Sequence, residues 1–156
     1  MGRVKFDMSG WKGLEKTLKN DKYFTRVGIL GSEASKQHDG TKKTNAEIGA
    51  IHELGLVAGI PQRSFLKMPL ELKLFEKIKS EKDNFYAALK SGKIVNWFAA
   101  VGWWCEEIIH NAFESSGFGS WEANAESTLK RKAPETKPLI HTRQLKNSIS
   151  SVVIEK

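Results

Sequence analysis

The sequence predicts an α+β fold in which a small, mainly antiparallel sheet packs against amphipathic helices and a long C-terminal loop precedes the last strand. Two segments near opposite ends of the chain, Tyr23–Leu30 and Ser150–Ile154, are rich in β-branched and aromatic residues, which is typical of strands. Between them, the apolar residues of Ile94–Phe113 fall on one wide helical face. The expected order of elements is strand, helix, strand, helix, long helices, loop and strand, and this order favours the α+β class.

The N-terminal part of the chain is expected to alternate strands and helices. Apolar and polar residues alternate over 4–8, which predicts a short strand, and Ser9 then caps a helix that runs through Leu18. The strand Tyr23–Leu30 follows, and Gly31 closes it. Two short strands therefore flank the first helix.

The next segment is expected to be a loop followed by a short helix. Polar residues over Ser32–Lys43 predict a flexible loop. Thr44 or Asn45 then caps a short helix, and Gly55 stops this helix because glycine lets the chain leave helical geometry. The residue before Pro61 cannot be helical, so an extended turn is expected before the next helix.

Apolar spacing predicts further helices in the middle of the chain. One begins at Ser64 and tolerates Pro69, because this residue falls within about the first turn. A second segment starts near Asp83 and breaks or kinks at Ser91-Gly92, after which the amphipathic stretch Ile94–Phe113 begins. The apolar residues that recur every four positions in the first of these helices are Leu66, Leu70, Leu74 and Ile78.

Residues Ser115–Thr142 are predicted to form a long loop, because they contain two glycines and two prolines and show little periodicity. A loop of this length inside a compact domain is usually functional or disordered, so we expect flexibility here. Trp121 and Leu129 indicate that the loop docks on something, for which a neighbouring subunit is one candidate. A short helical turn from Leu145 and the strand Ser150–Ile154 complete a single domain of 156 residues.

Composition excludes several classes of protein. A single cysteine, Cys105, cannot form an internal disulfide, so a disulfide-stapled secreted fold is excluded. The most apolar stretch, Trp97–Cys105, is too short to span a bilayer, so we expect no membrane partner and synthesis in a reducing cytoplasm. The formal net charge of +7 favours anionic partners, including nucleic acid, although a lysine-rich solvated surface gives the same charge.

No sequence pattern indicates catalysis, a cofactor or a metal ion. His52-Glu53 begins like the zinc-protease motif, but that motif needs a second histidine where this chain has Leu56. The four histidines show no ligand spacing, and the chain has neither a phosphate-binding loop nor a nucleophile elbow. We therefore expect no catalytic residue, no metal, no cofactor and no enzyme activity.

Three basic residues and two tryptophans are candidates for contacts with other molecules. Lys130, Arg131 and Lys132 form the best cluster for DNA phosphates, with a solvated basic loop as the alternative explanation. Trp103 points away from the apolar face of its helix, and Trp121 lies in the long loop. We expect both tryptophans to be candidates for a subunit interface, where large aromatic side chains are enriched.

Two segments together resemble a known family. Residues 44–55 and 60–66 contain a His-Glu-hydrophobic-Gly helix end and an Ile-Pro-x-Arg-x-Phe-Leu turn into a long helix, and residues 138–149 form the second segment. Both are similar to segments of phage virion morphogenesis and tail-completion proteins of the Mu G-like and HK97-type neck families. Arg143 stands where that pattern usually has glycine, so a left-handed turn is resisted there. The residues that carry the motif are Asn45, His52, Glu53, Gly55, Pro61, Arg63, Phe65, Thr142, Leu145 and Ser148.

The resemblance implies a structural protein of the virion, at the phage head-tail joint or the tail end, that forms a ring subunit for tail completion and head-tail joining. The implied partners are copies of the chain itself, with a hexamer as the expected ring, neighbouring connector and tail proteins, and phage DNA held non-specifically in the lumen. Assembly is then expected in the cytoplasm of the host bacterium. The alternative is a stand-alone basic DNA-binding module, because the positive charge fits that class as well.

Overall fold

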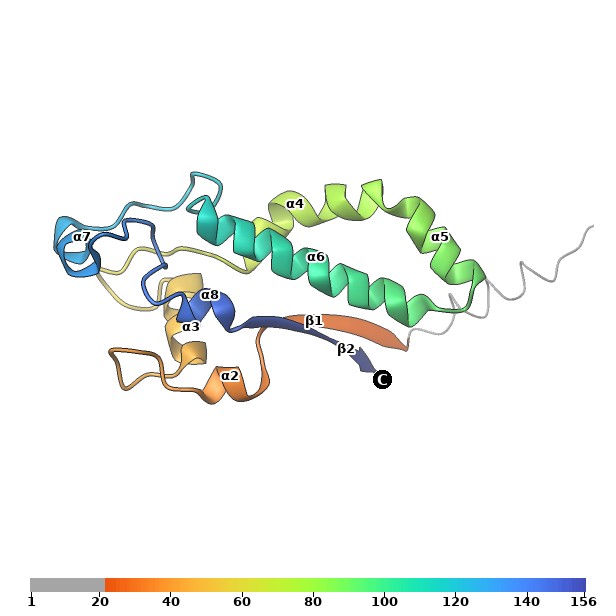
Figure 1. Cartoon of the computed structure of the whole chain (residues 1–156), viewed down its shortest axis with the longest axis horizontal. Helices are drawn as coiled ribbons and strands as arrows, with labels where there is room; N and C mark the ends of the chain where they lie inside the picture. The colour runs from red at the N-terminus through yellow and green to blue at the C-terminus, as the bar shows by residue number, and fades with distance from the viewer. Residues whose placement is uncertain (1–21) are drawn as a thin grey trace, which may run out of the picture.

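The computed structural model describes residues 22–156 of the chain. The strand expected over 4–8 and the helix expected from Ser9 through Leu18 lie outside the described residues. In the described part, seven helices follow the first strand along the chain and precede the second, and the two strands lie side by side (Figure 1). The helices are α2 (Gly31–Ser35), α3 (Asn45–Leu54), α4 (Lys67–Ser80), α5 (Lys82–Lys90), α6 (Ile94–Glu114), α7 (Glu126–Lys132) and α8 (Gln144–Asn147).

The two strands form one antiparallel sheet. Strand β1 (Tyr23–Ile29) pairs with β2 (Ile149–Glu155), and Arg26 lies opposite Val152 at the centre of the register. The sheet therefore joins the beginning and the end of the described chain. This small antiparallel sheet with helices packed on it confirms the predicted α+β fold.

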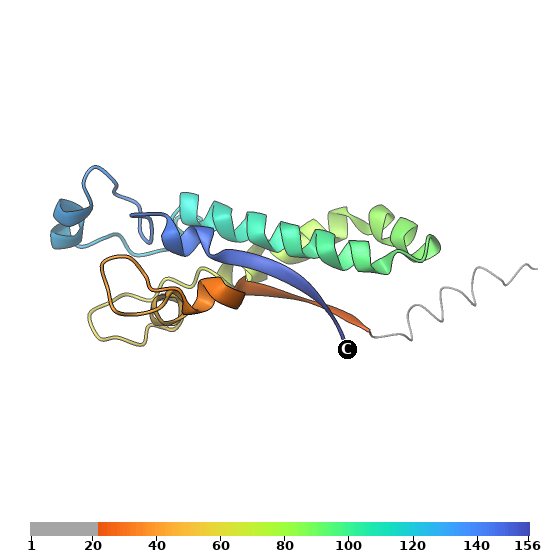
Figure 2. The same ribbon diagram turned by 60° about the horizontal axis from the view of Figure 1, so that its bottom comes forward.

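Helix α6 lies along one side of the sheet, as both views show (Figure 1 and Figure 2). The contact is close because Gly102 has no side chain, and a Cβ at this position would lie 2.5 Å from Oγ of Ser151. The hydroxyl of Thr25 donates a 2.7 Å hydrogen bond to the carbonyl of Phe98 on α6. The wide apolar face predicted for this helix is thus divided between the sheet and the other helices.

Helices α4 and α5 pack against α6, away from the sheet (Figure 1). Trp97 and Trp104, which are one heptad apart on α6, meet edge to face with their ring centroids 5.2 Å apart. The ring of Phe85 on α5 lies 5.1 Å from that of Trp97, and Nζ of Lys77 on α4 lies 5.1 Å from the ring of Trp104. Aromatic packing and a cation–π contact therefore join the three helices.

The predicted caps of α3 are confirmed. Thr44 and Glu47 form a reciprocal capping box at its N-terminus, and Gly55 adopts a left-handed conformation at its C-terminus, with φ of 65°. Helix α4 begins at Lys67, three residues after the predicted start, because residues 64–66 form the turn that leads into it.

The hydrophobic core lies where the C-terminal end of α6 meets the start of α4, helix α8 and the start of β2. Phe65 and Phe113 form its centre, with ring centroids 5.3 Å apart. Two core residues, Trp121 and Ile140, come from the segment that was predicted to be a loop. The buried members of the cluster are Phe65, Ile109, Ala112, Phe113, Trp121, Ile140, Leu145 and Ile149.

Both predicted loops contain regular structure, so the prediction of purely irregular segments was wrong. Helix α2 occupies the start of the first loop, and an isolated bridge joins Gln37 to Thr44 across its remainder. Helix α7 occupies the middle of the segment over 115–142. Helices of five and seven residues are too short to give a clear apolar period, and for this reason the sequence pattern missed them.

Candidate functional site

Glu53 of the family-like motif caps a second helix. Its carboxylate accepts hydrogen bonds from the backbone nitrogens of Phe65, Leu66 and Lys67 at 2.7, 2.9 and 3.0 Å, and from the hydroxyl of Ser64 at 2.8 Å. These nitrogens belong to the first turn of α4 and the residues before it, where backbone donors have no helical partner. A side chain of α3 therefore fixes the start and direction of α4.

Arg63 is buried by the segment that follows α6. Only 5% of this residue is exposed, and its Nε and Nη2 donate to the carbonyls of Glu122 and Ala123 at 2.9 and 3.1 Å. Arg63 therefore caps backbone carbonyls and does not pair with Glu53, whose carboxylate binds the start of α4. Burial lowers the pKa of the guanidinium, and the charge of Glu122 partly opposes this shift.

Asn45 fixes the segment before α3. The residue is fully buried, its Nδ2 donates to the carbonyl of Glu33 at 3.0 Å, and its Oδ1 lies 2.8 Å from Nδ1 of His38. The side chain thus holds α2 and the polar loop against the start of α3. Because all these contacts lie within the chain, the structure gives Asn45 a folding role.

The second family-like segment packs directly on the first. A Cβ at Gly49 on α3 would contact Phe65 at 3.4 Å and Leu145 of α8 at 3.8 Å. Ser148 closes α8 by donating a 2.7 Å hydrogen bond to the carbonyl of Leu145. Oγ1 of Thr142 accepts a 3.4 Å hydrogen bond from the backbone nitrogen of Gln144, the first residue of α8.

Arg143 adopts the left-handed conformation that glycine would favour, with φ of 64° and ψ of 5°. The departure from the family pattern therefore leaves the turn in place. The guanidinium of Arg143 lies 3.4 Å from the carboxylate of Glu114 at the end of α6.

Glu114 is the acceptor for three basic side chains. Lys137 and Lys146 reach its carboxylate at 2.8 and 2.6 Å, and Arg143 completes the set. Hydrogen bonds from Lys137 and Lys146 lower the pKa of Glu114 to about 2. This cluster joins the end of α6 to the segment that leads into β2.

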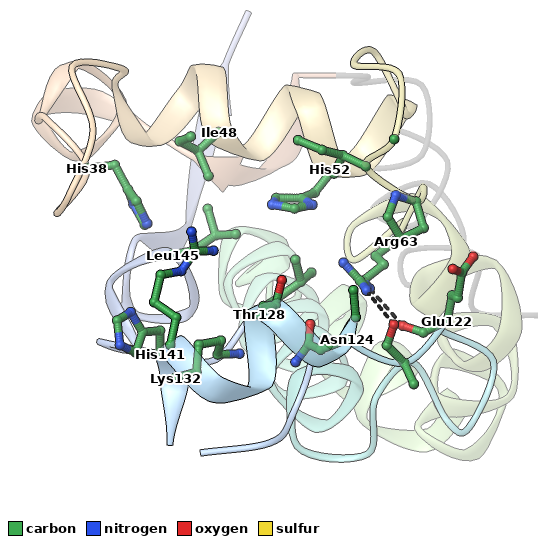
Figure 3. Close-up of a pocket in the computed structure, with 17 residues that line it drawn as sticks. His38, Ile48, His52, Arg63, Glu122, Asn124, Thr128, Lys132, His141 and Leu145 are labelled. Carbon is green, nitrogen blue, oxygen red and sulfur yellow. Dashed lines mark hydrogen bonds between the residues drawn. The ribbon is translucent and has the colours of Figure 1, made fainter. Parts of the chain in front are cut away.

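A cavity of about 650 Å³ opens between α3, α7 and the segment before α8 (Figure 3). His52 and Pro61 from the first family-like segment and Leu145 from the second line it, together with residues of the long C-terminal segment. Figure 3 shows the imidazole of His52 and the guanidinium of Arg63 directed into the space between α3 and α7. The further lining residues are His38, Ile48, Gly59, Ile60, Glu122, Ala123, Asn124, Ala125, Thr128, Arg131, Lys132, Leu139 and His141.

The lining of the cavity carries more basic than acidic side chains, namely Arg63, Arg131 and Lys132 against Glu122. Nδ1 of His52 is buried and has no hydrogen-bond partner among the described residues. Burial, with smaller contributions from the charges of Arg63 and His38, lowers the pKa of His52 to about 4. Sequence spacing missed this site because its residues come from positions far apart in the chain.

The predicted basic cluster is divided by the structure. Lys130 and Arg131 are exposed on α7, and Lys130 forms a 2.8 Å ion pair with Glu126 one turn earlier. Lys132 is only 7% exposed and donates to the carbonyl of Lys137 at 2.6 Å. The expectation that Lys132 faces DNA is therefore corrected, because its ammonium is used within the chain.

The two candidate tryptophans differ completely in exposure. Trp121 is 8% exposed, packs edge to face on Phe113 at 5.8 Å, and donates its indole N–H to the carbonyl of Ser64 at 3.1 Å. It anchors the long segment in the chain's own core, which corrects its assignment as an interface anchor. Trp103 is 70% exposed on α6 and stays available to a partner.

Further large apolar side chains are exposed on helices α4, α5 and α6, which together form the helical layer. Leu72 and Phe75 of α4, Tyr86 of α5 and Val95 of α6 all belong to this set, and Phe75 is as exposed as Trp103, at 70%. The apolar spacing of this helix does not predict Leu72 and Phe75, because they lie between the residues of the expected stripe. A helix with a second apolar face of this kind is typical of a surface that meets a partner.

No group of three or more metal-ligating side chains occurs in the described part of the chain. Cys105 is buried, and burial raises the pKa of its thiol to about 11, so the thiol is protonated at neutral pH. Among residues 22–156, no helix is both long and apolar enough to cross a membrane.

No protein-family model, curated protein or solved structure matches this chain.

Proposed function

We propose that this chain is a non-catalytic structural subunit of a tailed-phage particle, which assembles into a ring at the head-tail joint or the tail end. The observation that carries the proposal is the set of large apolar side chains that α4, α5 and α6 leave exposed, with Trp103 and Phe75 each 70% exposed. Large aromatic side chains left in water favour burial against a partner, and tryptophan is among the residues enriched in interface hot spots.

The arrangement of the family-like segments supports this proposal. Glu53 organises the start of α4, and Leu145 packs near Gly49 and Phe65. Segments that are far apart in the sequence therefore form one structural unit, as expected for motifs that maintain a fold. Their residues build a scaffold that holds the helical layer and its exposed side chains in place.

In a ring, one surface of each chain contacts a different surface of the neighbouring copy. Cyclic assembly by one patch against a second patch closes into a ring, for which we propose a hexamer by resemblance. Lys130 and Arg131 are exposed on α7 and offer positive charge to DNA in a lumen or to acidic neighbours. Connector and tail proteins are the proposed further partners, inside the host cytoplasm during assembly and in the virion afterwards.

The experiment is a mass measurement of the purified chain by light scattering and native mass spectrometry over a range of concentrations. We expect a closed oligomer for the natural sequence and a shift to monomer for Trp103→Ser. Leu56→Ser is the matched control, because Leu56 is also exposed, at 61%, but lies in the turn after α3. A natural chain that stays monomeric and binds DNA in a salt-sensitive manner contradicts the ring and favours the stand-alone DNA-binding module.

A further inference from the structure

We propose that the basic cavity between α3 and α7 binds a carboxylate side chain carried by a partner protein. This inference does not depend on the proposed ring. It rests on the cavity, whereas the ring rests on the exposed apolar side chains of α4, α5 and α6. The cavity measures about 650 Å³, which is ample for one or two side chains and is in the range of small-ligand sites, about 300–1,000 Å³.

The charges on the lining residues favour an anion. Arg63 and Arg131 supply two guanidinium groups, and Lys132 adds the charge of an ammonium that hydrogen-bonds within the chain, whereas Glu122 is the single acid in the lining. Glu122 is exposed, and the structure gives Arg63 hydrogen bonds to backbone carbonyls only. The charge of Glu122 acts on Arg63, but the hydrogen bonds of the guanidinium go to carbonyls. Buried charges are normally paired, so an incoming carboxylate supplies a hydrogen-bonded partner of opposite charge.

The guanidinium of Arg63 has a donor left for a ligand in the cavity. Nη1 of Arg63 makes no hydrogen bond with the described residues, since its two bonds involve Nε and Nη2. The imidazole of His52 also lines the cavity, although its Nδ1 is covered by other atoms and has no hydrogen-bond partner among the described residues. A carboxylate beside Nη1 of Arg63 accepts a hydrogen bond from it and brings a negative charge next to the guanidinium.

The depth and lining of the cavity favour a protein chain over duplex DNA. Only 5% of Arg63 is exposed. Because a DNA duplex is rigid and carries its phosphates on the outside, we expect these phosphates not to reach the guanidinium. An acidic side chain on a peptide protrudes far enough to do so. Apolar side chains also line the cavity, and they suit the apolar neighbours of an acidic residue in a peptide; these are Ile48, Ile60, Leu139 and Leu145.

The charges that face the imidazole of His52 determine how it responds to a bound carboxylate. Burial is the main cause of the lowered pKa of His52, and the charges of Arg63 and His38 lower it further. A carboxylate beside the ring acts in the opposite direction and raises this pKa. The other titratable groups of the lining are Glu122, Arg131, Lys132 and His141.

The test is a titration of the isotope-labelled full chain with a blocked pentapeptide that has a central glutamate between two leucines. Nuclear magnetic resonance follows the imidazole of His52 and Nε–H of Arg63. We expect both signals to move and the His52 pKa to rise. A peptide with glutamine in place of the glutamate should bind at least about tenfold more weakly, because it lacks the charge.

Two exposed neighbours on α7 give a matched pair of variants. Arg131 lines the cavity and Lys130 does not, so Arg131→Ala should weaken peptide binding about threefold or more, while Lys130→Ala should leave it unchanged within about twofold. Equal binding of both peptides, or no binding at millimolar concentration, overturns the proposal. Stronger displacement of the same signals by inorganic phosphate or a short DNA duplex also overturns it, in favour of a phosphate site.

Discussion

Glu53 illustrates how one residue organises two helices. Leu66, at the N-cap position of α4, provides no side-chain hydrogen bond, and the carboxylate of Glu53 on α3 takes over this role for three consecutive backbone nitrogens. The motif identified Glu53 as a residue of interest, yet its partners lie 11 to 14 positions further along the chain. No local pattern reveals an acceptor at that distance.

We predict that Glu53→Ala lowers the free energy of unfolding by about 2 kcal/mol, because the lost cap leaves several backbone donors without a charged acceptor. Urea unfolding followed by circular dichroism measures the effect. Glu71→Ala is the control, because the exposed carboxylate of Glu71 forms a surface ion pair with Lys67 one turn earlier on α4, and this change should stay within about 0.5 kcal/mol. An equal effect of the two substitutions contradicts the cap.

Residue by residue, the sequence suggested some of the side chains that line the cavity and gave no sign of others. His52, Pro61 and Arg63 belong to a recognisable motif, and all three line the cavity. Arg131 was selected for its charge and lines the same cavity, although DNA was its expected partner. Leu139 carried no signal, because an apolar residue in an irregular segment acquires its place only through tertiary packing.

At the level of elements, periodicity predicted long helices and failed for short ones. Helices α3 to α6 have caps, breaks or apolar faces that local chemistry explains, and the predicted break at Ser91-Gly92 separates α5 from α6. Helices α2 and α7 have no comparable signal. Strand β2 begins at Ile149, one residue before its predicted start, because Ile149 pairs with Ile29.

The crossing of α6 over the sheet gives a prediction at this scale. Gly102→Ala improves helix propensity by up to about 1 kcal/mol, but its Cβ would lie 2.9 Å from Cβ of Ser151 and 3.2 Å from Cγ2 of Thr25. We expect the clash to prevail, with a net loss of about 1–3 kcal/mol in the free energy of unfolding.

A double-mutant cycle tests this packing. Ser151→Gly alone removes the obstructing side chain, and combined with Gly102→Ala it should recover a substantial part of the lost stability, because the two residues are in contact. Thermal and urea unfolding of the two single variants and the double variant give the coupling energy. Strict additivity contradicts a direct contact between α6 and β2 at this position.

At the scale of the whole molecule, the segment over 115–142 is what a single sequence describes least well. It has the composition of a loop, yet Trp121 and Ile140 complete the core and α7 forms one side of the cavity. Trp121 was expected to contact a neighbouring subunit because a tryptophan in a polar segment needs a partner. The partners, Phe113 and Ser64, come from the chain itself, and only the three-dimensional arrangement reveals them.

Glu114 connects this segment to the rest of the molecule, and its titration leads to a prediction for overall stability. The folded chain holds the pKa of Glu114 at about 2, below its ordinary value of 4.5, because Lys137 and Lys146 hydrogen-bond to the ionised carboxylate. A lowered acid pKa means that the unfolded chain binds more protons between these two values. The contribution of Glu114 to stability is therefore complete above about pH 4.5 and is lost as the pH falls towards 2.

We expect Glu114→Gln to lower the free energy of unfolding by about 1 kcal/mol at pH 7, at the upper end of the range for exposed ion pairs, because one carboxylate serves three cations. The difference between the variant and the natural chain should shrink as the pH falls from 4.5 to 2 and should decrease in high salt. Urea unfolding at pH 7, 4 and 2.5 provides the measurement. Glu126→Gln is the matched control, since Glu126 forms a single exposed pair with Lys130 within α7. A constant difference between Glu114→Gln and the natural chain across this pH range would show that packing, and not charge, joins the end of α6 to the segment before β2.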